Sequence, residues 1–342
     1  MELKRKAVAV TTLVLLLTAA GLLIAQGAVV PARWLPGDAA ILPAIGDQAG
    51  PDIAWGADSA LAVWHDRRAL TPMGGYEYET SADIYGIRID AKGNPLEATP
   101  FIITDAQATQ ENPKVVWNGV HWLVIFETYR VSGTGYYYEK GFAFVRVSPA
   151  GQVLDATPIP VYNLIATGTS YWDAAFDGVN WVIAVQGSSG SSDVLAARIS
   201  PAGVVLDPMP RSLVPGTYYM RSNLHLACAA GVCLLTFDDA YGNGVNTTAA
   251  VRFDGNLNVL GGGLFSLLDT PVSDLAANGS GFYLVWNGQQ PDYSMAVMGA
   301  RINTAGQKLD GAGVNISGAH EPEPYTRTGV VWDGTQWKVY WG

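Results

Sequence analysis

Six short hairpins recur along this chain, and two apolar residues five positions apart flank each turn. The pairs are Trp55/Ala60, Trp117/Trp122, Phe176/Trp181, Cys228/Cys233, Ala277/Phe282 and Trp332/Trp337. Their first members are separated by 62, 59, 52, 49 and 55 residues. A regular period of this length indicates a repeat protein, in which each period forms one structural unit.

A second hairpin lies between successive pairs. Its clearest copies begin at Arg146 and Arg198, both followed by Ser-Pro-Ala-Gly, and looser copies begin at Arg88, Arg252 and Arg301. Proline presets φ early in such a turn, and glycine accepts the left-handed conformation that ends it. Two hairpins per period give four antiparallel strands, the size of one propeller blade.

The N-terminal stretch 29–38 resembles the hairpin 194–203, imperfectly by one residue, because Gly37 follows Arg33 by four positions and Gly203 follows Arg198 by five. It would supply the third and fourth strands of a blade whose first two strands lie in 329–341. We therefore predict an all-β fold: a six-bladed β-propeller of four-stranded antiparallel blades, with the last blade closed by N-terminal and C-terminal strands. The alternative is a frayed leader and an incomplete last blade.

The chain resembles secreted bacterial β-propeller repeat proteins in the segments 62–68, 83–90 and 332–337. The resemblance covers about residues 29 to 342. It implies a propeller fold outside the cytoplasm, and it supplies no catalytic residue because such families are mostly uncharacterised.

The N-terminus predicts export. Lys4, Arg5 and Lys6 precede a stretch without charge from Ala7 to Pro31. We assign 1–27 to a signal peptide or N-terminal membrane anchor, because the uncharged run is also long enough to span a bilayer. Residues 28–342 are predicted to form a single propeller domain that is secreted or extracytoplasmic, touching a membrane only through an uncleaved N-terminal segment.

The formal net charge of −10 and the lack of a Lys/Arg cluster beyond residue 6 exclude a nucleic-acid partner. No sustained helical period follows the N-terminus, so we expect no helices in the domain, and we expect a monomer. Cys228 and Cys233 occupy a flanking pair, which places them opposite each other on adjacent strands. We predict a disulfide worth about 2 kcal/mol, formed in an oxidising compartment.

Four arginines share one spacing to an acidic residue: Arg88 to Glu97, Arg146 to Asp155, Arg198 to Asp207 and Arg301 to Asp310. We interpret them as solvated ion pairs across the outer hairpin, each contributing under about 1 kcal/mol.

A polar set lies three residues before each flanking pair, near the start of the innermost strand. It consists of Asp52, Lys114, Asp173, His225, Asp274 and Gly329. In a propeller these residues ring the mouth of the central channel. Asp52, Asp173 and Asp274 are candidate catalytic carboxylates, and Lys114, His225 and the neighbouring Trp172 are candidate ligand-binding residues. We expect no cofactor and no protein metal site, although a channel-mouth cation such as calcium is an alternative. A polar mouth that holds only water is another.

The loops on the same face collect most of the tyrosines, whose rings suit stacking on sugars or anchoring a protein. The candidate ligand-binding tyrosines are Tyr76, Tyr78, Tyr136, Tyr137, Tyr138, Tyr218 and Tyr219.

Three functions remain open. The first is a binding module that recognises glycan or protein through the Tyr-rich face. The second is a glycoside hydrolase or lyase-type enzyme that uses two of the channel-mouth carboxylates, and the third is a structural module of the cell envelope.

Overall fold

A computed structural model describes residues 48–67, 82–106, 109–131, 138–161, 171–187, 193–216, 221–240, 246–290, 293–318 and 328–341. All of them belong to one compact unit, Gly37–Gly342. The predicted signal or anchor at 1–27 and the closing segment at 29–38 lie outside the described residues. No helix among the described residues is long and apolar enough to cross a membrane.

The described residues form antiparallel strands in six sheets. The first three sheets contain β1 Gln48–Trp55, β2 Ala60–Asp66, β3 Asp83–Ile89 and β4 Phe101–Thr104; β5 Thr109–Trp117, β6 Trp122–Val131, β7 Tyr138–Val147 and β8 Ile159–Val161; and β9 Trp172–Phe176, β10 Trp181–Gln186, β11 Val194–Ile199 and β12 Arg211–Val214. The other three contain β13 Arg221–Ala229, β14 Val232–Ala240, β15 Asn246–Asp254 and β16 Val259–Leu268; β17 Asp274–Ala277, β18 Gly281–Gln289, β19 Met295–Asn303 and β20 Val314–Asn315; and β21 Gly329–Trp332 and β22 Trp337–Tyr340.

The predicted hairpin register is confirmed in every repeat. The flanking residues face each other as strand partners in all six first hairpins, including Trp55 with Ala60 and Trp332 with Trp337. Cys228 and Cys233 are such partners too, with Cα atoms 4.0 Å apart, and they form the predicted disulfide. The repeat therefore places equivalent residues at equivalent points of successive sheets.

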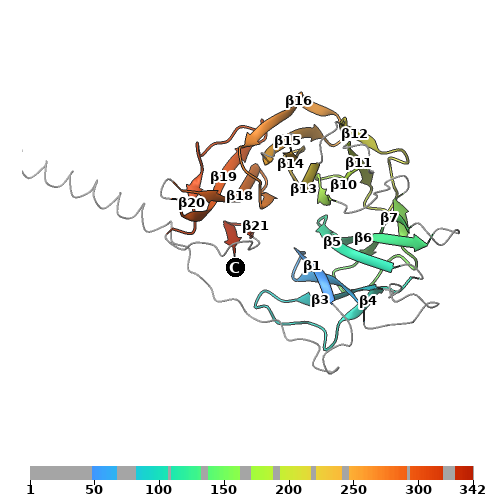
Figure 1. The fold of residues 1–342 in the computed structure, drawn as a ribbon. Helices are drawn as coiled ribbons and strands as arrows, with labels where there is room; N and C mark the ends of the chain where they lie inside the picture. Colours follow the sequence, from blue (N-terminus) through green and yellow to red (C-terminus); the bar gives the residue numbers. More distant parts are fainter. Residues whose placement is uncertain are drawn as a thin grey trace, which may run out of the picture. The chain divides into compact units, whose positions relative to one another are not determined.

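The sheets stand side by side around a common axis, with the first strand of each sheet innermost (Figure 1). Each hydrophobic cluster contains residues of two consecutive sheets along the chain. Five sheets have four strands, as predicted. The sixth has two strands among the described residues, so the predicted count of six four-stranded blades is not confirmed.

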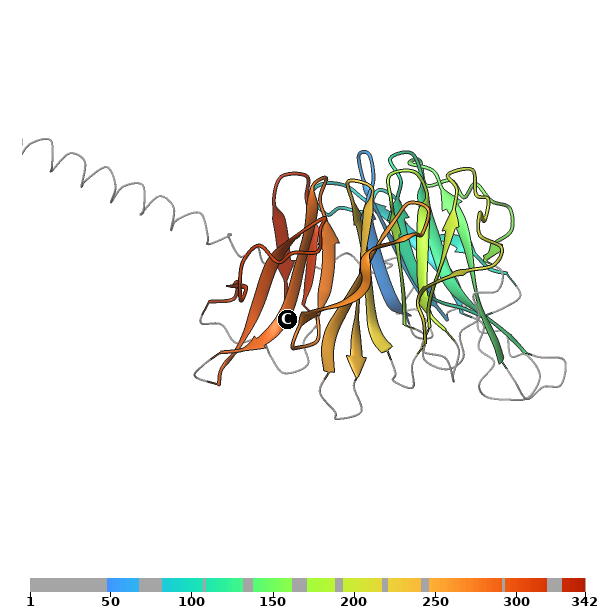
Figure 2. The same cartoon turned by 90° about the horizontal axis from the view of Figure 1, so that it is seen from above.

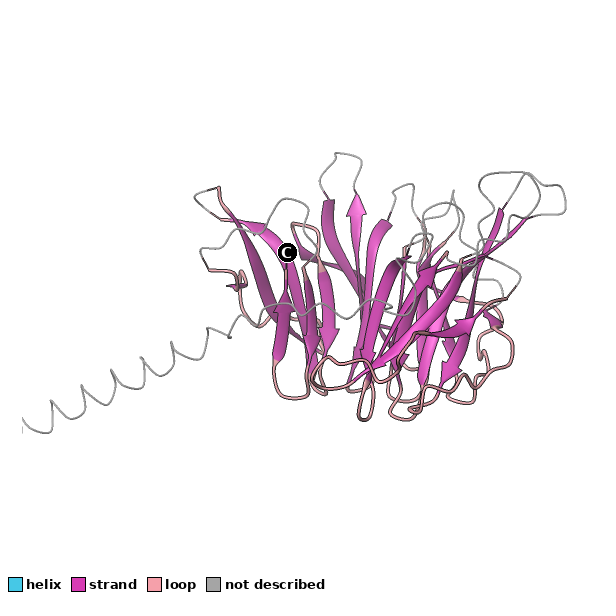
Figure 3. Cartoon of the chain, turned by 90° about the horizontal axis from the view of Figure 1, so that it is seen from below, coloured by secondary structure: helices cyan, strands magenta, loops and turns pink. Residues whose placement is uncertain are grey.

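The short turns gather on one edge of the sheets. The turns that join β1 to β2, β5 to β6 and β9 to β10 lie on this edge with the turns after β3, β7 and β11 (Figures 2 and 3). The starts of the innermost strands, where the polar set lies, are at the opposite edge. The described hairpin turns and the polar set therefore lie at opposite edges of the sheets.

Tryptophans of the flanking pairs connect neighbouring sheets. The indole Nε1 of Trp122 donates a hydrogen bond to the carbonyl oxygen of Ala54, and that of Trp181 donates to Val116, both at 3.1 Å. Trp122 and Trp181 are fully buried. They therefore satisfy backbone carbonyls of the preceding sheet as well as filling the core.

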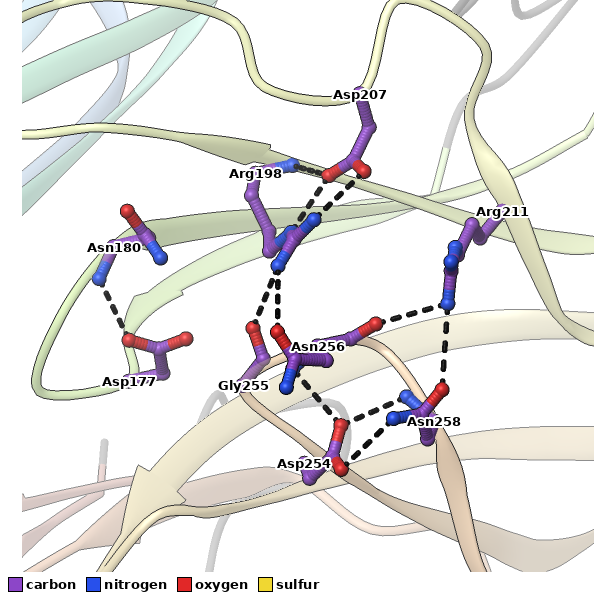
Figure 4. A network of polar contacts seen from close by, with 9 residues as sticks. All are labelled: Asp177, Asn180, Arg198, Asp207, Arg211, Asp254, Gly255, Asn256 and Asn258. Atoms are coloured by element: carbon purple, nitrogen blue, oxygen red, sulfur yellow. Dashed lines mark hydrogen bonds and ion pairs between the residues drawn. The ribbon is translucent and has the colours of Figure 1, made fainter.

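Four arginines of the outer hairpins form the predicted ion pairs, and three of these four also donate to a carbonyl oxygen of the next sheet. Arg198 binds Asp207 through Nε at 2.8 Å, and its Nη1 donates to the carbonyl oxygen of Gly255 at 3.0 Å (Figure 4). Arg88, Arg146 and Arg252 make the same crossing to Pro149, Pro201 and Thr304. The interpretation as solvated pairs was incomplete, because the same guanidinium also joins two sheets.

Candidate functional site

Backbone bulges aim the polar set into the channel mouth. Strands β1, β5 and β13 each break register just before Asp52, Lys114 and His225. Two residues before each of these lies a residue with positive φ, namely Gly50 (60°), Asn112 (50°) and Asn223 (55°). A bulge bends a strand and turns the next side chain, which is why bulges recur beside functional sites.

Five of the six predicted channel residues line one cavity of about 700 Å³. They are Asp52, Lys114, Asp173, His225 and Asp274, each from a different innermost strand. A volume in this range accommodates a small-molecule ligand. The three candidate carboxylates therefore line the same cavity.

Lys114 interacts with the channel aspartates. Its Nζ lies 2.8 Å from Oδ1 of Asp173. Burial alone would lower the pKa of Lys114, but the carboxylates of Asp173 and Asp52 outweigh it, so its pKa is raised. Burial raises the pKa of Asp52, with Lys114 opposing the effect. A raised pKa favours the protonated form of Asp52.

Each channel aspartate also holds the neighbouring sheet. Oδ2 of Asp52 accepts a hydrogen bond from the amide of Val115 at 2.7 Å, and Oδ2 of Asp173 accepts one from Leu226 at 2.7 Å. Asp274 does the same for Val330 at 2.9 Å. The accepting aspartates lie in the first, third and fifth sheets. In each case the donor is the backbone amide of the residue that directly follows the channel residue of the next sheet. A carboxylate oxygen has two lone pairs, so these bonds leave acceptor capacity towards the cavity.

His225 connects the cavity to a second layer of polar groups. Its Nδ1 lies 3.5 Å from Oδ1 of Asp274, and its Nε2 lies 3.1 Å from Oδ1 of Asn223. Asn223 is fixed in turn by donating to the carbonyl oxygen of Val272 at 2.5 Å. Asp238 interacts with both His225 and Asn223, and burial raises its pKa to about 6. The imidazole is therefore held in one orientation beside Asp274.

Tyr340 occupies the sixth position of the mouth and was missed by the sequence analysis. Gly329 has no side chain there, and its strand partner Tyr340 lies over it: a Cβ on Gly329 would come within 2.1 Å of the tyrosine ring. Tyr340 lines the cavity, and burial, reinforced by Asp274 and Asp52, raises the pKa of its hydroxyl. The sequence did contain a signal: Gly329 occupies the position that is polar in the other five repeats, and its strand partner Tyr340 is aromatic.

The remaining candidates divide into two groups. Trp172 is 6% exposed, packs edge-on against Phe142 with ring centroids 5.2 Å apart, and has the Lys114 ammonium 5.7 Å from its ring centroid. Its ring face contacts the Lys114 ammonium, and Trp172 is not among the residues that line the cavity. Tyr76, Tyr78, Tyr136, Tyr137, Tyr218 and Tyr219 lie outside the described residues, and of Tyr138 only the backbone, in β7, is described. Among the described side chains no group of three or more His, Cys, Asp or Glu residues is arranged to hold a metal ion.

Comparison with known proteins defines the fold. No family model matches the sequence, and no curated protein is significantly similar to it. Among solved structures, the Trypanosoma rangeli sialidase in complex with the inhibitor DANA has a TM-score of 0.51 at 7% identity, over 87% of this chain and 53% of that chain. A neuraminidase-like protein from A/bat/Guatemala/164/2009 has a TM-score of 0.50 at 11% identity, over 92% and 88%. The GH43_1 enzyme from Xanthomonas citri complexed with xylose has a TM-score of 0.44 at 13% identity, over 82% and 95%.

These structural neighbours are β-propeller glycoside hydrolases and neuraminidase-like proteins. At identities of 7% and 11%, the likeness to the sialidase and to the neuraminidase-like protein concerns the fold alone. The chain is thus an all-β protein of propeller architecture with a polar cavity at the channel mouth. The expected kinship with secreted bacterial repeat proteins has no support from the sequence comparisons.

Proposed function

We propose that the channel-mouth cavity binds a saccharide and cleaves its glycosidic bond. The observation that carries the proposal is the convergence of Asp52, Asp173 and Asp274, with Lys114 and His225, on one open cavity of about 700 Å³. Glycoside cleavage requires two carboxyl groups on either side of the bond, one of which gives a proton to the leaving oxygen. The fold of sialidases and related enzymes is compatible with this assignment but does not carry it.

Asp52 is the proposed proton donor, because burial raises its pKa and favours the protonated form. Asp274 is the proposed second carboxylate, acting as base or nucleophile. Its side chain is 28% exposed, against 15% for Asp173, and Asp173 is neutralised by Lys114. Tyr340 lines the same cavity as Asp52 and Asp274, and its hydroxyl can hydrogen-bond a sugar.

The charge of the cavity favours a neutral sugar over an acidic one. Lys114 is the one Lys or Arg among the described lining residues, and its charge is already matched by Asp173. A ligand carboxylate would add a negative charge beside three aspartates without gaining a free cation.

The test is hydrolysis of a panel of neutral aryl glycosides and polysaccharides, with sialosides and uronides as the acidic arm. Asp52→Asn and Asp274→Asn are the informative variants, because asparagine keeps a carbonyl oxygen for the bonds to Val115 and Val330. We expect each to lose at least about 100-fold in kcat/KM. Asp58→Asn, in the β1–β2 turn at the opposite end of the same strand, is the matched control and should keep full activity.

Two other outcomes would replace the proposal. Saccharide binding without cleavage by the unaltered protein would make it a binding module. The Tyr-rich loops would then be its first candidates, tested with Tyr136, Tyr137 and Tyr138 changed to Ala. Neither binding nor cleavage across the panel would favour a structural module of the cell envelope.

We further propose that the protein works outside the cytoplasm and has six blades, with β21 and β22 as the inner half of the sixth. The Cys228–Cys233 disulfide supports the location, because such bonds persist in oxidising compartments.

A further inference from the structure

Asp173 and Asp274 occupy equivalent positions in their sheets but have different neighbours in the cavity. Each accepts a hydrogen bond at Oδ1 from the amide of the residue that follows it, at 2.9 Å and 2.8 Å respectively. Each also accepts one at Oδ2 from an amide of the next sheet. At Asp173 the channel residue of the preceding sheet adds a third donor, because Nζ of Lys114 lies 2.8 Å from Oδ1. At Asp274 the group in that place is the imidazole of His225, whose Nδ1 lies 3.5 Å from Oδ1.

The distance between Nδ1 of His225 and Oδ1 of Asp274 is long for a hydrogen bond between a charged donor and a carboxylate. Such bonds are about 2.7–2.9 Å long, and the contact between Lys114 and Asp173 falls in that range. The separation of 3.5 Å is instead that of two acceptor atoms in contact with no proton between them.

The other ring nitrogen of His225 shows where the proton of the neutral imidazole lies. Nε2 is 3.1 Å from Oδ1 of Asn223, and an amide oxygen only accepts. The orientation of this amide is fixed, because the nitrogen of Asn223 donates to the carbonyl oxygen of Val272 at 2.5 Å and also to the carboxylate of Asp238. Nε2 therefore carries the hydrogen, and in the neutral imidazole the lone pair at Nδ1 faces Asp274.

A second asparagine shows which part of this arrangement belongs to the fold. Asn112 lies at the equivalent bulge of the second sheet, also with positive φ, and its amide nitrogen donates to Glu127 at 2.9 Å. Glu127 occupies the position of Asp238 at the end of the second strand. The bond from asparagine to acid is thus a repeated feature of the bulge. The bond from asparagine to the channel residue is made in the fourth sheet, by Asn223 with His225.

We propose that Asn223 is a positioning residue that keeps Nδ1 of His225 as a hydrogen-bond acceptor, so that His225 and Asp274 together select a hydroxyl group of the saccharide. Both residues line the cavity, and two acceptors 3.5 Å apart repel each other until a donor lies beside them. A hydroxyl group is the donor that a neutral sugar brings. A methyl ether or a hydrogen in its place leaves both acceptors unpaired, and a site of this kind rejects such analogues strongly.

This selection is compatible with the proposed role of Asp274 in cleavage. Each carboxylate oxygen has two lone pairs, and the amides of Leu275 and Val330 each use one of them, at Oδ1 and Oδ2. A ligand hydroxyl takes the second lone pair of Oδ1 and leaves one on Oδ2 for the reaction. The identity of the ligand as a saccharide rests on the function proposed above, whereas the position of the proton on His225 does not.

The first test measures that proton by ¹⁵N NMR of the full chain at about pH 8, above the range in which histidine ordinarily titrates. We expect a protonated Nε2 and an unprotonated Nδ1 at His225. Asn223→Gly should move the hydrogen to Nδ1, where Asp274 accepts it, and glycine tolerates the φ of 55° at this position. Asn112→Gly is the matched control and should leave the His225 signals unchanged. A protonated Nδ1 in the unaltered protein, or no change in Asn223→Gly, would overturn the proposal.

The second test compares an aryl glycoside with its deoxy derivatives. The probes are the 4-nitrophenyl glycosides of glucose, galactose, mannose and xylose, followed by the monodeoxy series of the one that is cleaved fastest. Removing one particular hydroxyl should lower kcat/KM at least about 100-fold in the unaltered protein and in Asn112→Gly. In Asn223→Gly the same removal should cost less than about 10-fold.

Equal factors in the unaltered protein and in Asn223→Gly would overturn the selection of a hydroxyl group. If the unaltered protein cleaves none of the glycosides, the proposed function fails and the saccharide fails with it. The NMR measurement still decides the position of the proton in that case, so the two failures are distinguishable.

Discussion

Asp173 on β9 accepts a hydrogen bond from the amide of Leu226 on β13 at 2.7 Å, while its other oxygen lies 2.8 Å from Lys114 on β5. One carboxylate therefore joins three consecutive innermost strands. The residues that face the cavity are also residues that hold the sheets together.

Removing this carboxylate should destabilise the protein. Asp173→Ala leaves the amide of Leu226 and the ammonium of Lys114 without their acceptor, at an expected cost of about 2–4 kcal/mol in the free energy of unfolding. Asp173→Asn should cost less, because it retains a carbonyl acceptor. Urea unfolding measures both, and Asp58→Ala in an exposed turn should stay within about 0.5 kcal/mol of the unaltered protein. Equal stability of Asp173→Ala would show that the bond between sheets contributes nothing.

The indole of Trp181 offers a test of the contacts that lie deeper in the core. Trp181→Phe keeps an aromatic ring but loses the donor to the carbonyl of Val116. We expect a loss of about 1–3 kcal/mol, from the unsatisfied carbonyl and the smaller ring. Trp122→Phe removes the equivalent bond to Ala54 and should behave alike. A difference of several kcal/mol between these two variants would mean that the repeats are not energetically equivalent.

The contact between Gly329 and Tyr340 predicts a compensating pair of substitutions. Gly329→Ala places a methyl group within 2.1 Å of the tyrosine ring, and should destabilise the protein by about 1–3 kcal/mol while displacing the ring. Tyr340→Ala in the same chain should relieve most of that cost. Thermal or urea unfolding of the two single variants and the double variant gives the coupling energy. If the two substitutions change the free energy of unfolding additively, the ring of Tyr340 does not contact position 329.

The buried carboxyl group of Asp83 predicts how stability changes with pH. It is 6% exposed, and burial, reinforced by Asp105 and Asp66, raises its pKa to about 6. The folded state therefore holds this proton more tightly than the unfolded state, and the contribution is lost as pH rises from about 4 to 6. Asp83→Asn removes the titration and should stabilise the protein at pH 7 by up to about 3 kcal/mol, with no gain at pH 4. A constant difference between the two proteins from pH 4 to 7 would contradict the assignment.

Much of this architecture can be predicted from the spacing of residues along the sequence. The spacing of the flanking pairs predicted the register of six hairpins, the pairing of Cys228 with Cys233 and the meeting of Asp52, Lys114, Asp173, His225 and Asp274 in one place. These features depend only on position along a strand. Alternation and turn chemistry determine such positions locally, and each repeat copies them.

The contacts between sheets were decided by the tertiary structure. The bonds from Asp173 to Leu226 and from Arg198 to Gly255 join residues more than fifty positions apart. The position of Tyr340 over Gly329 likewise depends on how a ring turns across its strand partner. Such contacts follow from the distance and rotation between packed sheets and from side-chain rotamers, which the period of a hairpin does not contain. The sequence by itself determined which residues share a level of the propeller, and the packing of sheets decided which of them touch.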